Sequence, residues 1–355
     1  MKRFLRWIYY LLPRIAGTRF MFACRNYVFE VTYRCNLDCI MCSFLREIEH
    51  MKGEITPREE LGAEELVTVV RRIPRHSNTV FTGGEPFMKK GFIELLRAAK
   101  ERGHSVTVGT NGVLLSEDVC AELVALGVDR IGISIDGTAE IHNAIRRRSN
   151  AYEGAINAVR RLRAARQAAA RHAPLVLVNA VILPENFRVL DEVVRVAAEN
   201  GADRVSIQVV DGSYERSGSR LREIIDPELD PLPNVPLIVP ADLKRALESA
   251  FATASRHNIA LFSSPSGMSI DDIVAYYQRS FGVEGCRCFL PWNTCRISPY
   301  GDMYPCMNYR IGNVCDSSLY SLWTSERYLR FREIFRGGCV RTCCAGCCKL
   351  ERRTA

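Results

Sequence analysis

The chain has 355 residues, of which 47% are hydrophobic and 25% are charged, as in ordinary globular proteins, and this length accommodates a large barrel domain and a smaller module. The net charge of +8 is spread along the sequence, without zinc-finger spacing or an aromatic-rich basic module, which argues for a solvated surface and against a nucleic-acid partner. Fifteen cysteines gather mainly in two groups, three within residues 35–42 and ten within residues 286–348, which favours bound metal in a reducing compartment over the disulfides of a secreted protein.

The first segment, residues 1–26, is basic and amphipathic. Its apolar run from Trp7 to Leu12 is too short to span a bilayer and is followed by Pro13. As a helix it would place apolar side chains on one face beside basic ones: Phe4, Ile8, Leu11 and Ile15 with Lys2, Arg3, Arg6 and Arg14. Two interpretations stay open, a helix packed across the bottom of a barrel and a peripheral membrane contact through residues 1–20. We predict a cytoplasmic protein, with the inner face of the membrane as the alternative location.

Strand-like and helix-like segments alternate from residue 27 to about residue 210. The strand-like segments are residues 27–33, 78–84, 104–112, 129–137, 174–183 and 203–210, and the helix-like segments are residues 62–73, 92–101, 117–127, 152–170 and 186–201. Six units with near-continuous apolar strands indicate an α/β fold, a parallel sheet curled into a partial (β/α)6 TIM-like barrel over residues 27–215. Residues 216–284 are predicted to be a linker and helical segment, and residues 285–355 a small Cys-rich β-hairpin and helix domain.

Chemically versatile residues come directly after the predicted strands. These are Cys35, the Gly83–Glu85 turn, Asn111 and Asp136. The carboxyl ends of parallel strands meet at one end of a barrel, where ligands bind in such folds. The sequence therefore places the functional site at this end.

Three cysteines, Cys35, Cys39 and Cys42, follow the first strand with Cys-x3-Cys-x2-Cys spacing. A [4Fe–4S] cluster held by three thiolates keeps one iron open for a further ligand. The neighbouring Gly83, Gly84 and Glu85 offer backbone carbonyls and a carboxylate that could accept hydrogen bonds from an amine. A zinc site completed by His50 is the alternative, but it would leave this Gly-Gly-Glu-Pro turn unexplained.

The cysteine spacing together with GGEP (residues 83–86) and SIDG (residues 134–137) resembles the radical S-adenosylmethionine (SAM) superfamily over residues 27–210. The resemblance implies a [4Fe–4S] cluster whose open iron binds the amino and carboxylate groups of SAM. It further implies reductive cleavage to a 5′-deoxyadenosyl radical, which abstracts hydrogen from a substrate, with an electron donor such as flavodoxin or ferredoxin.

Site residues carried over from this resemblance surround SAM. Gly83, Gly84 and Glu85 would hold the methionyl amine, and Ser134 and Asp136 would face the ribose or the carboxylate. Further assignments are Arg146 on the carboxylate, Asn111 and Asn179 lining the pocket, and Met41 in place of the aromatic residue that often contacts adenine. For Arg146 the alternative is a solvated basic run over residues 146–148.

The tail combines Cys288, Gly301 and Cys306 with IGN (residues 311–313) and a group of close cysteines, and resembles the SPASM or twitch extension of the same superfamily. The ligand set that this implies for one auxiliary [4Fe–4S] cluster is Cys288, Cys306, Cys344 and Cys347. A structural zinc is an alternative, because four thiolates suit zinc equally well. A second auxiliary cluster is another, because further cysteines remain: Cys286, Cys295, Cys315, Cys339, Cys343 and Cys348. Cys24 and Cys120 are interpreted as core residues.

The predicted function is that of a radical SAM oxidoreductase or peptide maturase that oxidises or crosslinks its substrate, with the auxiliary cluster as an electron acceptor or a substrate ligand. A small alcohol, a sugar or a lipid-linked molecule is the alternative substrate. A non-catalytic iron–sulfur scaffold is the alternative of another class. No catalytic side chain is assigned, and Gln208 and Asp211 are candidates by position alone.

Overall fold

The computed structural model describes residues 22–42, 59–210, 235–283, 286–306, 309–336 and 350–352. A ten-stranded sheet organises these residues, with strand order β11-β10-β9-β1-β2-β3-β4-β5-β6-β7. Its strands are β1 (Asn26–Glu30), β2 (Asn78–Thr82), β3 (Ser105–Thr110), β4 (Arg130–Ser134), β5 (Leu175–Val181), β6 (Arg204–Gln208), β7 (Ala260–Ser264), β9 (Thr294–Ile297), β10 (Asp302–Tyr304) and β11 (Gly312–Asn313). Neighbouring strands from β9 through β1 to β7 pair in parallel, whereas β10 is antiparallel to β9 and to β11.

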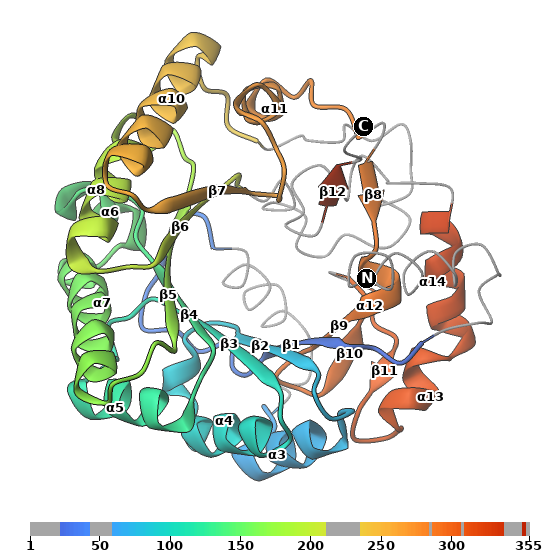
Figure 1. Cartoon of the computed structure of the whole chain (residues 1–355). Helices are drawn as coiled ribbons and strands as arrows, with labels where there is room; N and C mark the ends of the chain where they lie inside the picture. Colours follow the sequence, from blue (N-terminus) through green and yellow to red (C-terminus); the bar gives the residue numbers. More distant parts are fainter. Residues whose placement is uncertain are drawn as a thin grey trace.

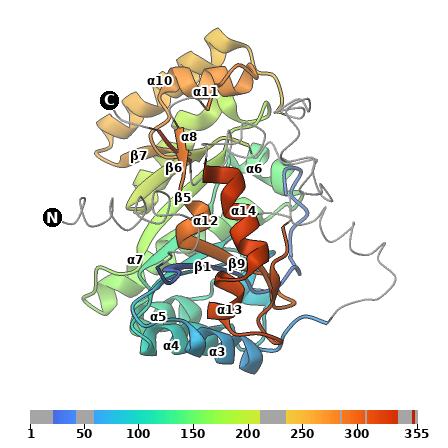
Figure 2. The same ribbon diagram turned by 90° about the vertical axis from the view of Figure 1, so that its right-hand side faces the viewer.

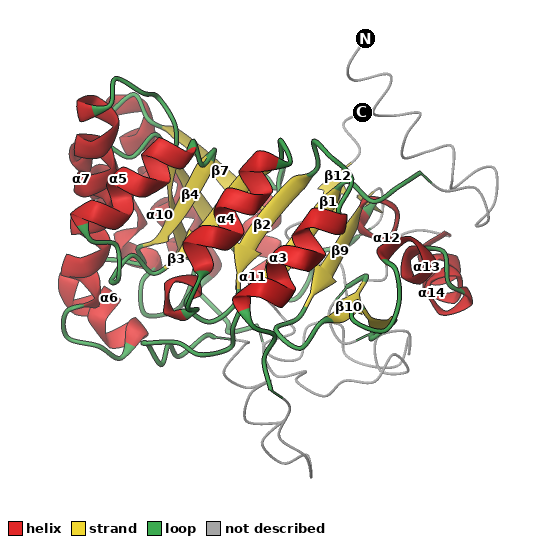
Figure 3. Ribbon diagram, turned by 90° about the horizontal axis from the view of Figure 1, so that it is seen from below, coloured by secondary structure: helices red, strands yellow, loops and turns green. Residues whose placement is uncertain are grey.

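The sheet curves, and helices cover its convex side (Figures 1 and 3). The helices of this part are α3 (Ala63–Arg72), α4 (Phe92–Glu101), α5 (Glu117–Leu126), α6 (Ala139–Arg146), α7 (Ala151–Ala168), α8 (Leu190–Asn200), α10 (Pro240–Arg256) and α11 (Ile270–Tyr277). Each carries an apolar stripe, as in α4, where Phe92, Leu95, Leu96 and Ala99 are buried at helical spacing. Burial of these stripes against the sheet forms the main core.

The strands alternate between fully buried and half-buried side chains. In β5, Val176, Val178 and Ala180 are 0% exposed, while Leu177 and Asn179 are half-buried. Since successive side chains of a strand point to opposite faces, the first set packs under the helices and the second faces the concave side of the sheet. The concave side is therefore where polar strand residues such as Asn179 are available to a ligand.

The C-terminal part continues the barrel sheet through β9, which lies beside β1. Its further elements are β8 (Cys286–Cys288), α12 (Leu290–Asn293), α13 (Leu319–Trp323), α14 (Glu326–Arg336) and β12 (Leu350–Arg352). The three helices group beside β9 and β10 (Figures 1 and 2), and β8 pairs with β12 in a separate two-stranded sheet. Arg332 of α14 is fully buried among them, its guanidinium 3.8 Å from the centre of the Tyr328 ring.

These observations confirm the predicted α/β class with a parallel sheet and extend it at both edges. Strand β7, in a segment that sequence analysis assigned to a linker and helical region, adds to the barrel next to β6. Its sequence ALFSS is short and half-exposed, so it lacks the apolar run that marked the other strands. Helix α6 was also missed, because its IHNAIR segment runs into consecutive arginines.

Within the described residues, no helix is both long and apolar enough to cross a membrane. Residues 1–20, for which a membrane contact was considered, lie outside the described residues.

Candidate active site

The three N-terminal cysteines lie on one loop at the carboxyl end of β1. Cys35, Cys39 and Cys42 are half-buried, and a turn with the Cys42 N–H donating to the Cys39 carbonyl at 3.1 Å brings the last two together. The pKa of the Cys35 thiol is raised to about 11, chiefly by burial and to a smaller extent by the neighbouring Cys39, Glu85 and Cys42, while the hydrogen bond from the Leu37 N–H opposes the shift. Three thiolates that repel one another in a partly desolvated loop are a donor set that bound iron would stabilise, so the loop fits a [4Fe–4S] cluster.

The glycines of the GGEP turn make room for this loop. A Cβ atom at Gly83 would lie 2.4 Å from the Thr32 carbonyl oxygen, and one at Gly84 would lie 2.2 Å from that of Arg34. The close approach is fixed by hydrogen bonds from the Gly84 N–H to Thr32 at 2.7 Å and from the Glu85 N–H to Arg34 at 2.9 Å. Sequence analysis expected these glycines to let the backbone approach a ligand, and the structure shows that they let it approach the chain entering Cys35.

The Glu85 side chain forms hydrogen bonds within the protein that the sequence did not indicate. Its carboxylate is fully buried and accepts hydrogen bonds from the Thr110 hydroxyl at 2.8 Å, the Asn111 N–H at 2.9 Å and the Phe87 N–H at 3.2 Å. Burial raises the pKa of Glu85, and the three donors oppose that shift. The carboxylate joins the ends of β2 and β3, so this geometry does not support the expected contact between the Glu85 side chain and the SAM amine.

Asn111 contacts the cysteine loop directly. Its amide group donates to the Asn36 side-chain oxygen at 2.8 Å, and its own side-chain oxygen accepts from the Val113 N–H at 3.0 Å. The residue is 8% exposed. Asn111 is therefore at the site, as predicted by its position after β3, and in this structure it supports the loop residue next to Cys35.

The end of α6 holds the other side of the cysteine loop. The Ile40 N–H donates to the Ile145 carbonyl at 3.0 Å. The next three residues each reach the loop: Arg146 donates to the Cys39 Sγ at 3.5 Å, Arg147 to the Asp38 carboxylate at 3.1 Å and Arg148 to the Asn36 carbonyl at 2.8 Å. The alternative of a solvated basic run does not hold for Arg146, which is buried, whereas Arg147 and Arg148 are exposed and make their contacts with the loop at its surface.

Asp136 fixes the position of the Arg146 guanidinium. Its carboxylate is fully buried and accepts from Arg146 Nε and Nη2, both at 2.6 Å, and from the Val181 N–H at 3.1 Å. Burial lowers the pKa of Arg146, but the Asp136 and Cys39 charges outweigh it and the pKa is raised overall. Because protein donors surround the buried carboxylate, its geometry favours orienting Arg146 over the direct contact with SAM that was expected.

His142 completes this group. Burial lowers its pKa to about 4, so the imidazole is neutral near pH 7, and its Nδ1 accepts from the Asp136 N–H at 3.1 Å. In the absence of a proton on Nδ1, the 3.6 Å approach to the Asp136 carboxylate is a packing contact rather than an ion pair. His142 thus fixes the backbone of Asp136 while Asp136 holds Arg146.

The remaining predicted pocket residues line the concave side of the sheet. Ser134 ends β4 and is paired in register with Asn179 of β5, and both are half-buried. Gln208, at the end of β6, donates to the Asn179 side-chain oxygen at 3.4 Å. Met41 is partly buried against the core between Cys39 and Cys42 in sequence. The structure brings these polar residues to the predicted end of the strands, and their contacts with SAM stay predictions.

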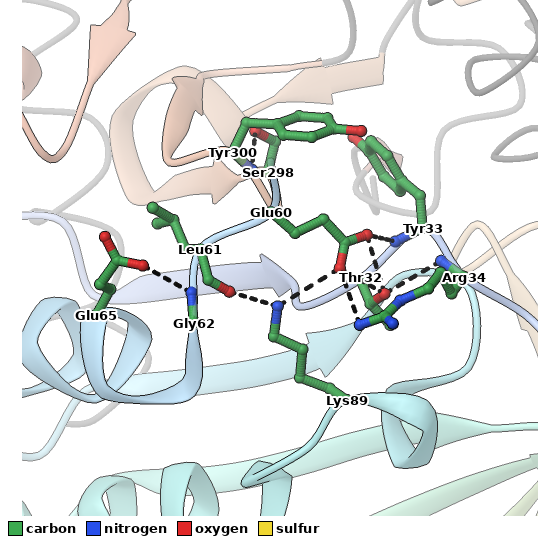
Figure 4. A network of polar contacts seen from close by, with 10 residues as sticks. All are labelled: Thr32, Tyr33, Arg34, Glu60, Leu61, Gly62, Glu65, Lys89, Ser298 and Tyr300. Atoms are coloured by element: carbon green, nitrogen blue, oxygen red, sulfur yellow. Dashed lines mark hydrogen bonds and ion pairs between the residues drawn. The ribbon is translucent and has the colours of Figure 1, made fainter. Parts of the chain in front are cut away.

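A buried ion pair that sequence analysis missed stabilises the start of the loop (Figure 4). The Glu60 carboxylate accepts from the Thr32 hydroxyl at 2.8 Å and the Tyr33 N–H at 2.8 Å, and pairs with Lys89 at 3.4 Å. Lys89 is 7% exposed and also donates to the Leu61 carbonyl. A lone acidic residue before a helix carries no sequence signal of this kind, because its partners are distant in the chain.

Two of the four predicted auxiliary ligands lie within the described residues. Cys288 is buried in β8 and Cys306 is half-buried just after β10, while Cys344 and Cys347 lie outside the described residues. The predicted hairpin between the first two is present as β9 and β10. Cys24 and Cys295 are both buried with their sulfurs 3.8 Å apart, and Cys120 is buried in α5.

Within the described ranges, no three His, Cys, Asp or Glu side chains converge on one point to share a single metal ion, so the cysteine loop is interpreted as a site for a cluster of several irons. His50, the fourth ligand in the zinc alternative, is not among them.

Family models match two parts of the chain. The model of the radical SAM superfamily matches residues 29–197, and that of the SPASM iron–sulfur cluster-binding domain matches residues 286–348. The chain is 27% identical to the tungsten-containing aldehyde ferredoxin oxidoreductase cofactor-modifying protein of Pyrococcus furiosus, over 88% of this chain and 85% of that one. It is 25% identical to the AdoMet-dependent heme synthase of Methanosarcina barkeri, over 91% and 90%, and 27% identical to the PqqA peptide cyclase of Gluconobacter oxydans, over 83% and 75%.

Solved structures share the fold. Streptococcus suis SuiB bound to the precursor peptide SuiA has a TM-score of 0.65 at 16% identity, covering 96% of this chain and 74% of SuiB. The anSMEcpe structure with bound AdoMet has a TM-score of 0.59 at 17% identity, covering 89% of each chain. These likenesses agree with the partial barrel and its C-terminal extension. The chain belongs to the radical SAM superfamily, with a C-terminal SPASM domain, and its cofactors are [4Fe–4S] clusters and SAM.

Proposed function

We propose that this chain cleaves SAM reductively and uses the resulting radical to abstract hydrogen from a peptide substrate, which it oxidises or crosslinks. The observation that carries the proposal is the placement of three half-buried thiols on a loop held by both the GGEP turn and the end of α6. A non-catalytic iron–sulfur scaffold would need the three cysteines but not the GGEP and SIDG motifs.

Each residue of the site has a role in the proposal. Cys35, Cys39 and Cys42 would ligate the cluster, and the reduced cluster would supply the one electron needed to split SAM into methionine and a 5′-deoxyadenosyl radical. The carbonyls of Gly83 and Gly84 would accept from the methionyl amine, and Arg146 would pair with the carboxylate.

The wall of the pocket continues along the sheet. Met41 would lie against the adenine, and Ser134 and Asn179 would face the ribose from the concave side. Asn111 supports the loop residue beside Cys35. None of these side chains is proposed to transfer a proton, and the base or specificity residue for the substrate is not assigned.

The peptide substrate is supported by the PqqA peptide cyclase relative and by the fold of SuiB, whose structure holds a precursor peptide. A small-molecule or cofactor substrate is the second candidate. It is supported by the heme synthase and cofactor-modifying relatives, which match this chain over 91% and 88% of its length. A small alcohol, a sugar and a lipid-linked molecule belong to this second candidate.

The C-terminal cluster has an electronic role in the proposal. One auxiliary [4Fe–4S] cluster, with Cys288, Cys306, Cys344 and Cys347 as ligands, would accept the electron that the substrate radical loses when it is oxidised. Pairing of β8 with β12 carries the C-terminal end of the chain to the strand that contains Cys288. A flavodoxin or ferredoxin in the cytoplasm would supply the electron for the SAM-binding cluster.

Formation of 5′-deoxyadenosine tests the proposal. Protein reconstituted without air with iron and sulfide is expected to produce it from SAM when reduced with dithionite. Cys39→Ala is expected to abolish the product, whereas Cys315→Ala, which changes an exposed cysteine far along the chain, is expected to leave it unchanged. Product formation that survives Cys39→Ala would contradict the site assignment, and loaded protein that never forms the product would favour the scaffold.

A further inference from the structure

Arg146 makes contacts that SAM recognition alone does not require. Its side chain is 11% exposed, and its guanidinium lies between a fully buried carboxylate and a cysteine of the loop. Nε and Nη2 point to Asp136 at 2.6 Å, which leaves Nη1 directed at the Cys39 Sγ at 3.5 Å. A planar fork held on one edge by a carboxylate presents its remaining N–H groups in a fixed direction.

The distance between the guanidinium and the Cys39 sulfur, together with the burial of the Arg146 side chain, decides how strongly this cation acts on the cluster. A hydrogen bond to a cluster thiolate and a nearby positive charge both stabilise the reduced cluster, which carries one more negative charge than the oxidised form. In a desolvated environment the interaction is weakly screened. Arg147, the next residue, is 57% exposed at its side chain and pairs with Asp38, which is 68% exposed, so its charge is screened by solvent.

We propose that Arg146 raises the reduction potential of the SAM-binding cluster through its hydrogen bond to Cys39, with Asp136 as the positioning residue that aims the guanidinium. The inference rests on the proposed function, because it requires a cluster on Cys35, Cys39 and Cys42. It goes beyond SAM recognition, since the effect exists before SAM binds. The reduction is a one-electron step in which the electron comes from flavodoxin, ferredoxin or dithionite and the cluster is reduced.

The reduction potential of the SAM-binding cluster, measured without SAM by an EPR-monitored titration, tests the proposal. The signal is identified as the one that Cys39→Ala removes. Arg146→Gln is expected to shift the potential to a more negative value, and Arg146→Lys is expected to shift it less, because an ammonium keeps the charge but cannot hold Asp136 and reach Cys39 as a fork does. Arg147→Gln, the matched control, is expected to leave the potential unchanged.

Two outcomes overturn the inference while leaving the proposed function intact. The first is an Arg146→Gln variant with wild-type iron content and an unchanged potential. The second is an equal shift in Arg147→Gln, which would trace the effect to general surface charge. Wild-type protein that holds no cluster at all would overturn the proposed function, and this inference with it.

A second measurement needs no change at Arg146. Protein containing 15N-labelled arginine is expected to show a 15N coupling in the pulsed EPR spectrum of the reduced SAM-binding cluster, transmitted through the N–H···S bond. The coupling is expected to weaken in Asp136→Asn, where the guanidinium loses its anchor. Absence of the coupling in loaded wild-type protein overturns the inference even where Arg146→Gln fails to assemble a cluster.

Discussion

Two glycines and one buried carboxylate determine, residue by residue, where the cysteine loop lies. Gly83 and Gly84 have no room for a Cβ because the carbonyls of Thr32 and Arg34 occupy the space. Glu85, the next residue, is fixed by three donors from its own turn and from the end of β3. The GGEP turn is thus as much a support for the cysteine loop as a candidate SAM contact.

Gly84→Ala is expected to displace the loop and to reduce both cluster loading and SAM affinity. The added Cβ would lie 2.2 Å from a backbone oxygen, which cannot move aside as a flexible side chain can. Iron and sulfide per chain after reconstitution, with SAM binding followed by calorimetry, measure the effect.

The matched control for this substitution is Gly62→Ala. There the new Cβ would meet its nearest atom, Glu65 Oε2, at an ordinary 3.5 Å. If Gly84→Ala takes up as much iron and sulfide as Gly62→Ala and wild type, the close backbone approach at Gly84 is not needed for the cluster.

At the scale of elements, the cysteine loop is clamped between two neighbours. On one side Glu60, just before α3, joins Thr32, Tyr33 and Lys89 (Figure 4). On the other side the end of α6 provides the Ile145 carbonyl, which accepts from the Ile40 N–H, and the buried Arg146, which donates to Cys39. The loop itself has little regular structure, so these contacts must fix its conformation.

Glu60→Gln is expected to destabilise the fold by about 1–3 kcal/mol, because the buried Lys89 ammonium loses its charge partner. Chemical unfolding of the cluster-free chain measures this change in stability. Iron per chain after gel filtration measures how well the cysteine loop retains its cluster. Iron is expected to be lost faster from the variant than from wild type.

Glu65→Gln is the control for the Glu60 substitution. Glu65 is exposed and its carboxylate caps the Gly62 N–H at 2.7 Å, so its loss is expected to lower stability by no more than about 1 kcal/mol. Equal effects of the two substitutions on iron retention would contradict the role given to Glu60.

The sequence predicted elements well where apolar periodicity is strong. The strands β1 to β6 and the helices α3, α4, α5, α7 and α8 follow from it, and β3 and β5 alternate as a sheet covered by helices requires. Strand β7 and helix α6 were missed because one is short and half-exposed and the other runs into arginines. Asp136 and Glu85 lie just after β4 and β2, where the sequence put them, but the partners that fix their carboxylates are distant in the chain and carry no local signal.

At the scale of the whole molecule, the C-terminal domain is joined to the barrel through one continuous sheet. β9 pairs with β1, the strand that leads into the cysteine loop, and Tyr328 of α14 donates to the Thr294 carbonyl of β9 at 3.1 Å. The Trp323 indole N–H donates to the Phe22 carbonyl at 2.9 Å. The domain that would hold the auxiliary cluster is therefore attached to β1, the strand that leads into the cysteine loop.

Tyr328→Phe is expected to lower the free energy of unfolding by about 1–2 kcal/mol, because it removes a buried hydrogen bond to the Thr294 carbonyl. Tyr320→Phe removes a hydroxyl whose residue is 72% exposed and is expected to change stability by less than about 0.5 kcal/mol. Denaturant unfolding of both variants makes the comparison. A Tyr328→Phe variant as stable as Tyr320→Phe would contradict the packing of α14 on β9.

Pulsed electron–nuclear double resonance on the reduced protein with SAM labelled with 15N at its amino group tests the central claim most directly. If the cysteine loop holds a [4Fe–4S] cluster whose open iron takes the amino and carboxylate groups of SAM, the spectrum shows a coupling from the labelled nitrogen, and Cys39→Ala removes it. Cluster-loaded wild-type protein that binds SAM and shows no such coupling would contradict the claim.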